Sequence, residues 1–248
     1  MNEKSYNKVV KAFEKYYEQY KDLSKNIILK YNHSYNVANL MEELSDRLYL
    51  SEEDKYLAKT IGLLHDIGRF EQLKEFDSFD DKIMDHAVFG VKYLFEENHI
   101  RDFIKDDKYD NIIKESIANH NLIEIKDGLS DRELLFAKMI RDMDKTDIFF
   151  QIAVKIKNSF IDKPSDIVLE KFNNRECISH ELVVTDSDRV INLFSFLFNY
   201  YFDESLEILK ETDNFGLYIS TIEVSEEQEK LFNKIKNDCY KIIGMEIL

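Results

Sequence analysis

The sequence predicts an all-α protein, and two observations carry this prediction. The chain of 248 residues contains one proline and six glycines, so few residues interrupt a helix. Apolar residues recur at intervals of three and four along most of the chain, whereas the strict alternation that marks a half-buried strand is scarce. We therefore expect a helical fold with no sheet.

The N-terminal part of the chain carries two stretches with helical spacing. The first covers residues 5–22, where one apolar face is formed by Tyr6, Val9, Val10, Phe13, Tyr16, Tyr17 and Tyr20. Such a face is normally buried in the core. A second helix is expected to open at His33, with an apolar face that continues through Val37, Leu40, Met41, Leu44 and Leu48. Taken alone, His33 is a capping or buried histidine.

A third helix is expected to begin at Ser51, because a serine followed by three acidic residues is typical of a helix N-terminus. It runs to the stretch LLHDIGRF, residues 63–70, which places His65 and Asp66 near its end. Gly68 is expected to stop this helix, since glycine tolerates the left-handed conformation found at helix ends. A polar loop is then expected over residues 71–81.

The next helix is expected to begin at about Asp81 and to carry His86. His86 shares a face with Ala87 and Gly90, and these small residues would let another helix approach closely. A following helix ends at His120. The helix expected over residues 130–145 has an apolar spacing that places Asp144 on its buried side.

Composition limits the function. The net charge of −15 argues against a nucleic-acid partner, which requires a basic surface. Cys177 and Cys239 form no Cys-x-x-Cys pair, which predicts neither a disulfide framework nor a thiolate zinc site and fits a reducing cytoplasm. The N-terminus lacks a signal-peptide pattern, and the most apolar stretch, residues 190–202, is too short and polar to span a bilayer. We expect a cytoplasmic protein with no membrane partner.

Two kinds of metal-ligating residue share core-facing positions or helix ends. They are four of the six histidines, His33, His65, His86 and His120, and two aspartates, Asp66 and Asp144. Burying a carboxylate is costly unless it is paired or bound to a metal. Imidazole and carboxylate together suit divalent metal ions, so convergence on a metal would account for all six burials. His99 and His180 lack this context and are expected at the surface.

The order His … His-Asp … Asp resembles the HD-domain superfamily of metal-dependent phosphohydrolases. The four defining positions are matched by His33, His65-Asp66 and Asp144, in the local sequences NHSYNVANLM, GLLHDIGRF and IRDMDKTDIF. The last of these contexts selects Asp144 over Asp142 and Asp147. Small bacterial members of the superfamily also have two intermediate histidines, which correspond here to His86 in DHAVFG and His120 in IANHN.

The resemblance implies an HD-domain helical bundle with additional C-terminal helices. It covers about residues 25–155, and we expect residues 1–248 to form a single domain in which 156–248 are an extension packed on the core. Two of the helices in this extension are expected over residues 187–210 and 224–243. Their aromatic faces belong either to the core or to a homodimer interface.

The resemblance also implies the roles of the site residues. His33, His65, Asp66 and Asp144 would hold one divalent ion, which is Mn, Fe, Ni, Co, Zn or Mg. His86 and His120 would either hold a second ion, with Asp66 as the bridge, or contact the substrate phosphate and orient the water. Arg69 and Lys145 adjoin the ligands and are candidate phosphate contacts, whereas Lys74 and Lys82 are expected at the surface.

The expected substrate is a small phosphorylated molecule, with a nucleotide favoured. The Gly-Tyr-Pro motif of members that degrade cyclic di-GMP is absent from the sequence, and so is the Glu-Asp pair that usually follows His-Asp in guanosine tetraphosphate hydrolases. Two alternatives stay open. One is a di-iron oxygenase on the same fold, and the other is a sensor that binds a nucleotide without turning it over.

Overall fold

The computed structural model describes residues 1–155 and 157–245, and it is all-α as the sequence predicts. The chain divides into two compact units, one formed by Met1–Asp144 and the other by the chain from Lys145 onward. The long helix α8 (Asp131–Lys155) begins in the first unit and ends in the second. Since each unit has its own core, the two are described separately.

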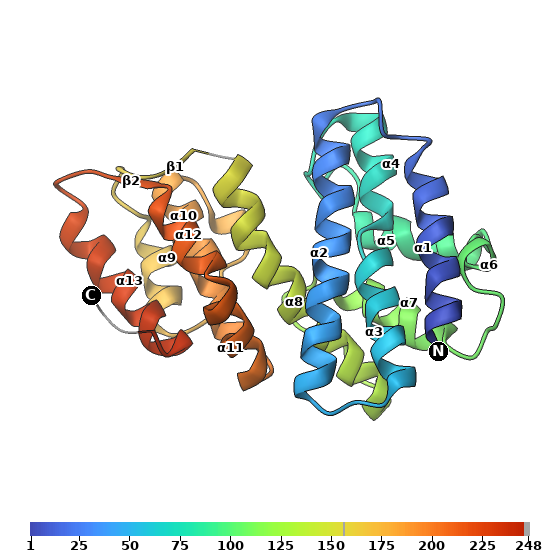
Figure 1. Ribbon diagram of the computed structural model, residues 1–248. Coiled ribbons are helices and arrows are strands. Elements are labelled where there is room, and N and C mark those ends of the chain that lie inside the picture. Colours follow the sequence, from blue (N-terminus) through green and yellow to red (C-terminus); the bar gives the residue numbers. More distant parts are fainter. Residues whose placement is uncertain (156, 246–248) are drawn as a thin grey trace. The chain divides into compact units, whose positions relative to one another are not determined.

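The first unit consists of helices. In chain order they are α1 (Glu3–Tyr17), α2 (Lys25–Arg47), α3 (Glu52–Leu64), α4 (Ile67–Phe76), α5 (His86–Val91), the π-helical turn η1 (Lys92–Glu96), α6 (Ile100–Phe103), α7 (Asp110–Asn119) and the first part of α8. Helices α2 and α3 pack along each other, and α1 lies against α3 (Figure 1). The predicted Ser51 cap is confirmed, because its side chain accepts a hydrogen bond from the backbone N–H of Asp54.

An aromatic cluster holds α1 against α4. The ring of Phe70 is fully buried and meets the rings of Phe13 and Tyr16 edge-on, with centroids 5.8 and 5.6 Å away. The hydroxyl of Tyr16 also donates a hydrogen bond to the carbonyl of Ile67. The aromatic stripe predicted for the first helix is therefore core, and it anchors the segment that directly follows His65 and Asp66.

Several predicted helix boundaries in this unit are wrong. His33 does not open its helix, because α2 begins at Lys25 after Ser24 and places His33 well inside. The helix expected from Asp81 begins instead at His86, because the side chain of Asp85 accepts hydrogen bonds from the N–H groups of Ala87 and Val88 and so caps α5 there.

Gly68 does not stop a helix either. It lies in the first turn of α4, which extends into the predicted polar loop and ends at Phe76 with Asp77 in the left-handed conformation. A Cβ atom on Gly68 would lie 2.1 Å from the carbonyl oxygen of His86 and 2.8 Å from the backbone nitrogen of Gly90. Glycine is required here for the close approach of α4 and α5, which agrees with the prediction that small residues near His86 admit another helix.

The second unit is built from shorter elements. They are the end of α8, then β1 (Asn158–Phe160), α9 (Asp166–Asn173), η2 (His180–Leu182), α10 (Asp186–Ser195), η3 (Phe196–Asn199), α11 (Asp203–Thr212), α12 (Asn214–Ser220), β2 (Ile222–Val224) and α13 (Glu229–Ile243). The helix predicted over 187–210 is thus divided into three, and the one predicted over 224–243 begins later, at Glu229. Strands β1 and β2 pair in parallel, so the expectation of no sheet is wrong for these two short segments.

Aromatic side chains fill the core of the second unit. Phe149, Phe194, Phe215 and Tyr218 are fully buried and contact one another through ring pairs 5.2–5.9 Å apart. The aromatic faces of these helices therefore pack as core within this unit.

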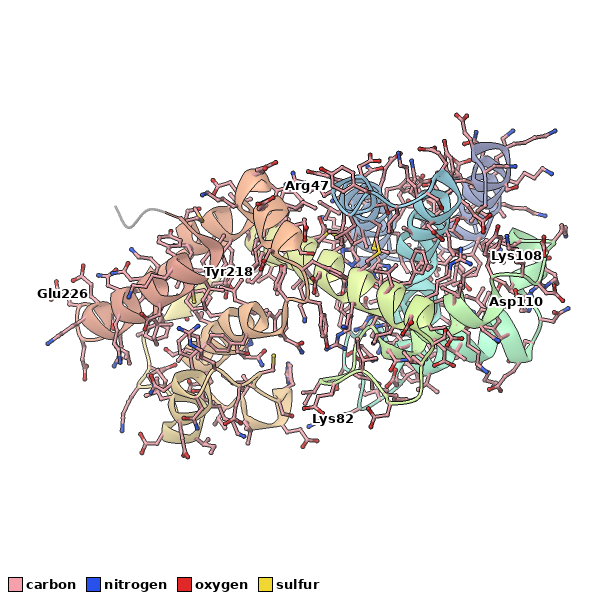
Figure 2. All side chains as sticks on the ribbon, turned by 90° about the horizontal axis from the view of Figure 1, so that it is seen from below. Arg47, Lys82, Lys108, Asp110, Tyr218 and Glu226 are labelled. Carbon is pink, nitrogen blue, oxygen red and sulfur yellow. The ribbon has the colours of Figure 1, made fainter. Side chains whose placement is uncertain are left out.

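The surfaces of both units carry charged side chains. Lys108 of the first unit and Glu226 of the second, for example, are exposed and point outward (Figure 2). None of the helices in the described part of the chain is both long and apolar enough to cross a bilayer.

Candidate metal centre

All six predicted ligands lie in the first unit, and each comes from a different position in the helical framework. His33 lies within α2, His65 follows the last residue of α3, and Asp66 precedes the first residue of α4. His86 is the first residue of α5, His120 follows α7, and Asp144 lies on α8. The fold brings them into two neighbouring groups, His33–His65–Asp144 and Asp66–His86–His120, each of which could hold a metal ion.

The first group is centred on one oxygen of Asp144. Oδ1 of Asp144 lies 3.0 Å from Nε2 of His33 and 3.5 Å from Nε2 of His65. Both imidazoles are fully buried. Asp142, which the family context disfavours as a ligand, is also buried but belongs to neither group.

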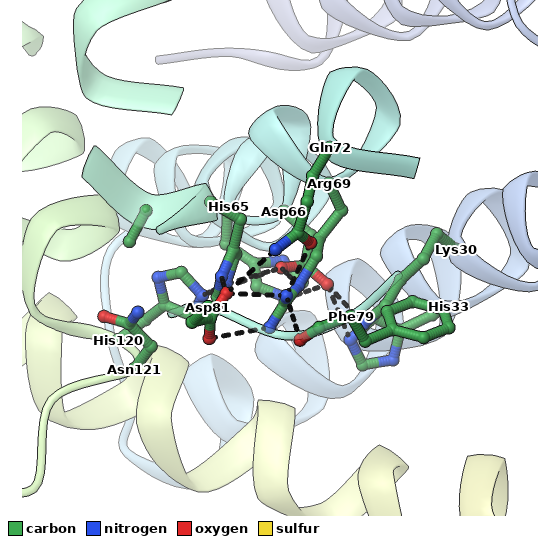
Figure 3. A network of polar contacts seen from close by, with 12 residues as sticks. Lys30, His33, His65, Asp66, Arg69, Gln72, Phe79, Asp81, His120 and Asn121 are labelled. Atoms are coloured by element: carbon green, nitrogen blue, oxygen red, sulfur yellow. Dashed lines mark hydrogen bonds and ion pairs between the residues drawn. The ribbon is translucent and has the colours of Figure 1, made fainter. Parts of the chain in front are cut away.

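The second group is centred on Oδ1 of Asp66. This atom lies 3.1 Å from Nε2 of His86 and 3.6 Å from Nε2 of His120, and the two Nε2 atoms are 2.9 Å apart. The other oxygen of Asp66, Oδ2, faces the first group, at 3.5 Å from Nε2 of His33 and 3.7 Å from Nε2 of His65 (Figure 3). One carboxylate thus presents an oxygen to each group.

The backbone decides which ring nitrogen of two histidines carries the proton. Nδ1 of His65 lies 2.7 Å from the carbonyl oxygen of Gly62, and Nδ1 of His120 lies 2.7 Å from that of Ile117. A carbonyl only accepts, so Nδ1 is the N–H donor in both rings, and Nε2 of the neutral imidazole carries a lone pair. For His86, the Asp81 carboxylate 2.7 Å from Nδ1 favours the same tautomer.

A neutral ring of this tautomer directs a lone pair at a carboxylate oxygen, whereas a protonated ring directs an N–H group at it. Several acceptor atoms that converge without a donor repel one another, and a buried set of this kind is stabilised by a cation. In the described residues, Nε2 of His65 is buried without a hydrogen-bond partner. Neutral imidazole nitrogen and carboxylate oxygen are the ligands that divalent transition metals take in proteins, so the residues present fit a metal ion.

Both aspartates are held in the charged form that a metal requires. Burial alone would raise the pKa of Asp66, but the Lys30 ammonium and the neighbouring imidazoles hold it well below its usual range. Burial acts in the same direction on Asp144, and the imidazoles of His33 and His65 outweigh it, so the pKa of Asp144 is also well below its usual range. The lowered pKa values favour ionised carboxylates over protonated ones.

The cations considered in the sequence, Arg69, Lys145 and Lys74, have different partners in the structure. Nε of Arg69 lies 3.8 Å from Oδ1 of Asp66, but its guanidinium donates to both oxygens of Asp81 and to the carbonyl of Phe79. The ammonium of Lys145 donates to the carbonyl of Asn199 within the second unit. Lys74 is exposed and pairs with Glu71, as expected for a surface residue. Contact of Arg69 or Lys145 with a phosphate stays a prediction.

The structure adds two charged residues that the sequence analysis missed. Nζ of Lys30 lies 2.5 Å from Oδ2 of Asp66, and Lys30 stands one helical turn before His33 in α2. This i, i+3 spacing puts both side chains on one face, a signal that was available in the sequence. Asp81, by contrast, lies in the segment between α4 and α5, where no periodicity indicates its contact with His86.

A buried arginine orders the segment that carries His120. Arg141 lies on α8 one turn before Asp144, and its side chain is almost fully buried. Its guanidinium donates hydrogen bonds of 2.8 Å to the carbonyls of Asn119 and Ile123, and another to that of Leu122. The helix that carries a ligand of the first group therefore also fixes the backbone around a ligand of the second.

The remaining histidines lie outside both groups. His180 is exposed, and the His99 side chain is 42% exposed and paired with Asp102, so both predicted surface histidines are confirmed.

The HD domain family model matches residues 31–192 of the chain, a range that includes all six candidate ligands. No curated protein and no solved structure matches this chain.

Proposed function

Since this chain belongs to the HD domain family, we propose that it is a metal-dependent phosphohydrolase that acts on a nucleotide or another small phosphate ester. The observation that carries the proposal is the position of Asp66, whose two carboxylate oxygens face two separate groups of metal-ligating residues. An arrangement of this kind suits two ions that share a carboxylate. Two ions side by side are suited to clamp the attacking and leaving oxygens of a phosphoryl transfer.

The six candidate ligands would hold two ions. His33, His65 and Asp144 would hold one ion, His86 and His120 a second, and Asp66 would bridge the two. A bound divalent metal would lower the pKa of the attacking water and polarise a phosphoryl oxygen. The hydrogen bonds to the carbonyls of Gly62 and Ile117 fix the tautomers of His65 and His120, so in the neutral rings Nε2 is the nitrogen that presents a lone pair to an ion.

Cations beside the ligands favour an anionic substrate. Lys30 lies near one oxygen of the Asp66 carboxylate and Arg69 near the other. The whole chain has a net charge of −15, so two cations beside the ligands are a specific feature of this position and not a general property of the surface. In the described part of the chain Cys177 and Cys239 are not joined in a disulfide, which is consistent with action in the cytoplasm.

A second candidate uses the same two groups. An oxygenase with a di-iron centre would also require histidines and a bridging carboxylate, and the second group supplies the extra histidines. We prefer the phosphohydrolase because Lys30, beside Asp66, offers a cation to an anionic phosphate. A sensor without turnover is less consistent with a complete ligand set.

Metal content is the first experiment. The protein would be purified anaerobically without a tag or added metal, analysed by mass spectrometry, and then assayed for phosphate release on a panel of nucleotides and simple phosphate esters. Release that depends on Mn, Co, Ni, Zn or Mg would support the phosphohydrolase. About two irons per chain with O₂ consumption and no phosphate release would favour the oxygenase. Absence of any metal, even after dialysis against Mn²⁺, would contradict both.

A further inference from the structure

We propose that Lys30 binds the phosphate of the substrate on the side of the site formed by His33, His65 and Asp144. This inference rests on the proposed phosphohydrolase function and extends it by one substrate-contacting residue. Its starting point is the 2.5 Å distance between Nζ of Lys30 and Oδ2 of Asp66. The side chain of Lys30 is 12% exposed, so it lies at the edge of the buried ligand set and not on the open surface.

The oxygen that Lys30 contacts also faces the first group. Oδ2 of Asp66 lies 3.5 Å from Nε2 of His33 and 3.7 Å from Nε2 of His65. An ion held by that group would therefore share this oxygen with the ammonium of Lys30. Two cations beside one carboxylate oxygen repel each other, and a second anion between them would offset the repulsion. A phosphoryl oxygen is the anion that the proposed reaction brings to this place.

The hydrogen bonding of Lys30 leaves capacity for such an anion. An ammonium group has three N–H donors, and one of those on Lys30 is directed at Asp66. Arg69, near the other oxygen of Asp66, is differently placed, because its two terminal nitrogens donate to Asp81 and to the carbonyl of Phe79 and its Nε is buried. Of the two cations, Lys30 is therefore the better candidate to contact substrate, and Arg69 the better candidate to hold the structure around it.

The aromatic ring of Phe79 restrains the positions of the Lys30 and Arg69 side chains. The ring of Phe79 lies 5.8 Å from Nζ of Lys30 and 5.8 Å from the central guanidinium carbon of Arg69. Figure 3 shows Phe79 labelled near Asp66, with Lys30 and His33 extending toward the carboxylate. Contact with an aromatic face favours a cation and restrains its position. The Lys30 ammonium is thus kept next to Asp66 instead of extending into solvent.

The test separates binding of metal from binding of phosphate. The full-length protein and its Lys30→Met variant would be titrated with Mn²⁺, and the Mn²⁺-loaded proteins would then be titrated with inorganic phosphate, both by calorimetry. Loss of a competing cation should tighten Mn²⁺ binding by ~3-fold or more. Loss of a charge-assisted hydrogen bond should weaken phosphate binding by ~10-fold or more. A residue with a purely structural role would not move the two affinities in opposite directions.

Two further variants serve as controls. Lys25→Met removes the same charge from the exposed start of the same helix and should change neither affinity. Lys30→Arg keeps the charge and should retain most of the phosphate affinity, which guards against a Lys30→Met protein that is simply misfolded. Opposite shifts in Lys30→Met, with little change in the controls, would support the proposal.

Two results would overturn the proposal, and they differ in what else they affect. If the wild-type protein hydrolyses phosphate esters but Lys30→Met binds phosphate as tightly as wild type, the role of Lys30 is wrong and the proposed function stands. If the wild-type protein binds neither Mn²⁺ nor phosphate, the proposed function fails together with this inference.

Discussion

Nδ1 of His86 lies 2.7 Å from Oδ1 of Asp81, which also accepts a hydrogen bond from Arg69 at 2.7 Å. Burial alone would raise the pKa of Asp81, but His86 and Arg69 lower it to about 2. The carboxylate is therefore charged and keeps the His86 ring turned with Nε2 toward Asp66. A carboxylate behind a ligating histidine orients the ring and increases its basicity.

Asp81→Ala should weaken the binding of the ion assigned to Asp66, His86 and His120 by ~10- to 100-fold, as is usual for loss of such a supporting carboxylate. The ion assigned to the first group should bind almost as before, because Asp81 contacts none of its ligands. A Mn²⁺ titration followed by calorimetry should show two binding steps in the wild type and one strong step in the variant.

The matched control for this prediction is Asp80→Ala. Asp80 is the preceding residue, it is exposed, and its carboxylate accepts a hydrogen bond only from the nearby backbone N–H of Lys82 among the contacts that the structure describes. Equal losses in the two variants would show that the whole segment matters, and not the Asp81–His86 contact.

Asp66→Ala should abolish both metal retention and turnover, because this carboxylate faces both ligand groups. Loss of the buried charge also leaves Lys30 without its partner, so circular dichroism must show that the variant is folded. His180→Ala, in an exposed residue outside the site, should leave metal content and activity unchanged. Full activity in Asp66→Ala would contradict the assigned site.

The helical fold could be predicted from the sequence because its signals are local. The apolar face predicted for the first helix is found on α1, although this helix ends at Tyr17 and not at residue 22, and the Ser51 cap is found as predicted. Boundaries were less predictable. The helix that contains His33 starts at Lys25, in the stretch KNIILKYN, where three consecutive apolar residues give no clear helical spacing, and α5 starts late because the Asp85 side chain caps it.

A contact with a ligand was predictable from the sequence only where the two residues lie on the same helix. Lys30 and His33 are one turn apart, so helical geometry alone places them on one face. Asp81 reaches His86 from the segment after α4, and Gly68 meets the carbonyl of His86 across two helices. Both contacts depend on how α4 and α5 pack, which no spacing in the sequence determines. The short strand pair β1–β2 is likewise a contact between distant segments.

Gly68→Ala should lower the free energy of unfolding by about 1–3 kcal/mol or more, the usual cost of forcing an atom into a packed interior. The added Cβ would lie 2.1 Å from the His86 carbonyl oxygen, so α5 must move, and metal binding at the second group should weaken with it. Thermal unfolding and Mn²⁺ titration would measure the two effects.

Gly128→Ala provides the comparison for Gly68. Gly128 has φ of +88° and no atom within 4 Å of an added Cβ, so alanine there strains only the local backbone. The expected cost is about 1–2 kcal/mol of stability. Metal affinity should be unaffected, and a similar loss of metal affinity in both variants would exclude the α4–α5 contact as the cause.

Asp188 is the polar centre of the second unit, and its replacement should destabilise that unit in a pH-dependent way. Its fully buried carboxylate accepts hydrogen bonds from the N–H and hydroxyl of Ser165 and from the N–H groups of Val184 and Thr185, so it joins the starts of α9 and α10. Asp188→Ala should cost about 2–3 kcal/mol at neutral pH, because the partner donors lose a charged acceptor. Asp186→Ala, in an exposed residue of the same helix start, should cost less than about 0.5 kcal/mol.

The pH dependence follows from the direction of the pKa shift. Burial alone would raise the pKa of Asp188, but the hydrogen bonds from Ser165, Thr185 and Val184 lower it below its ordinary value. A group with a lowered pKa in the folded state stabilises the fold above its unfolded-state pKa, about 3.9 for aspartate, and this contribution is lost as the pH falls through the folded-state value. The difference in unfolding free energy between wild type and Asp188→Ala should therefore be constant from about pH 5 to 7 and shrink below about pH 4. Urea unfolding at a series of pH values would measure it, and a difference that grew on acidification would show that the carboxylate is not stabilised in its charged form.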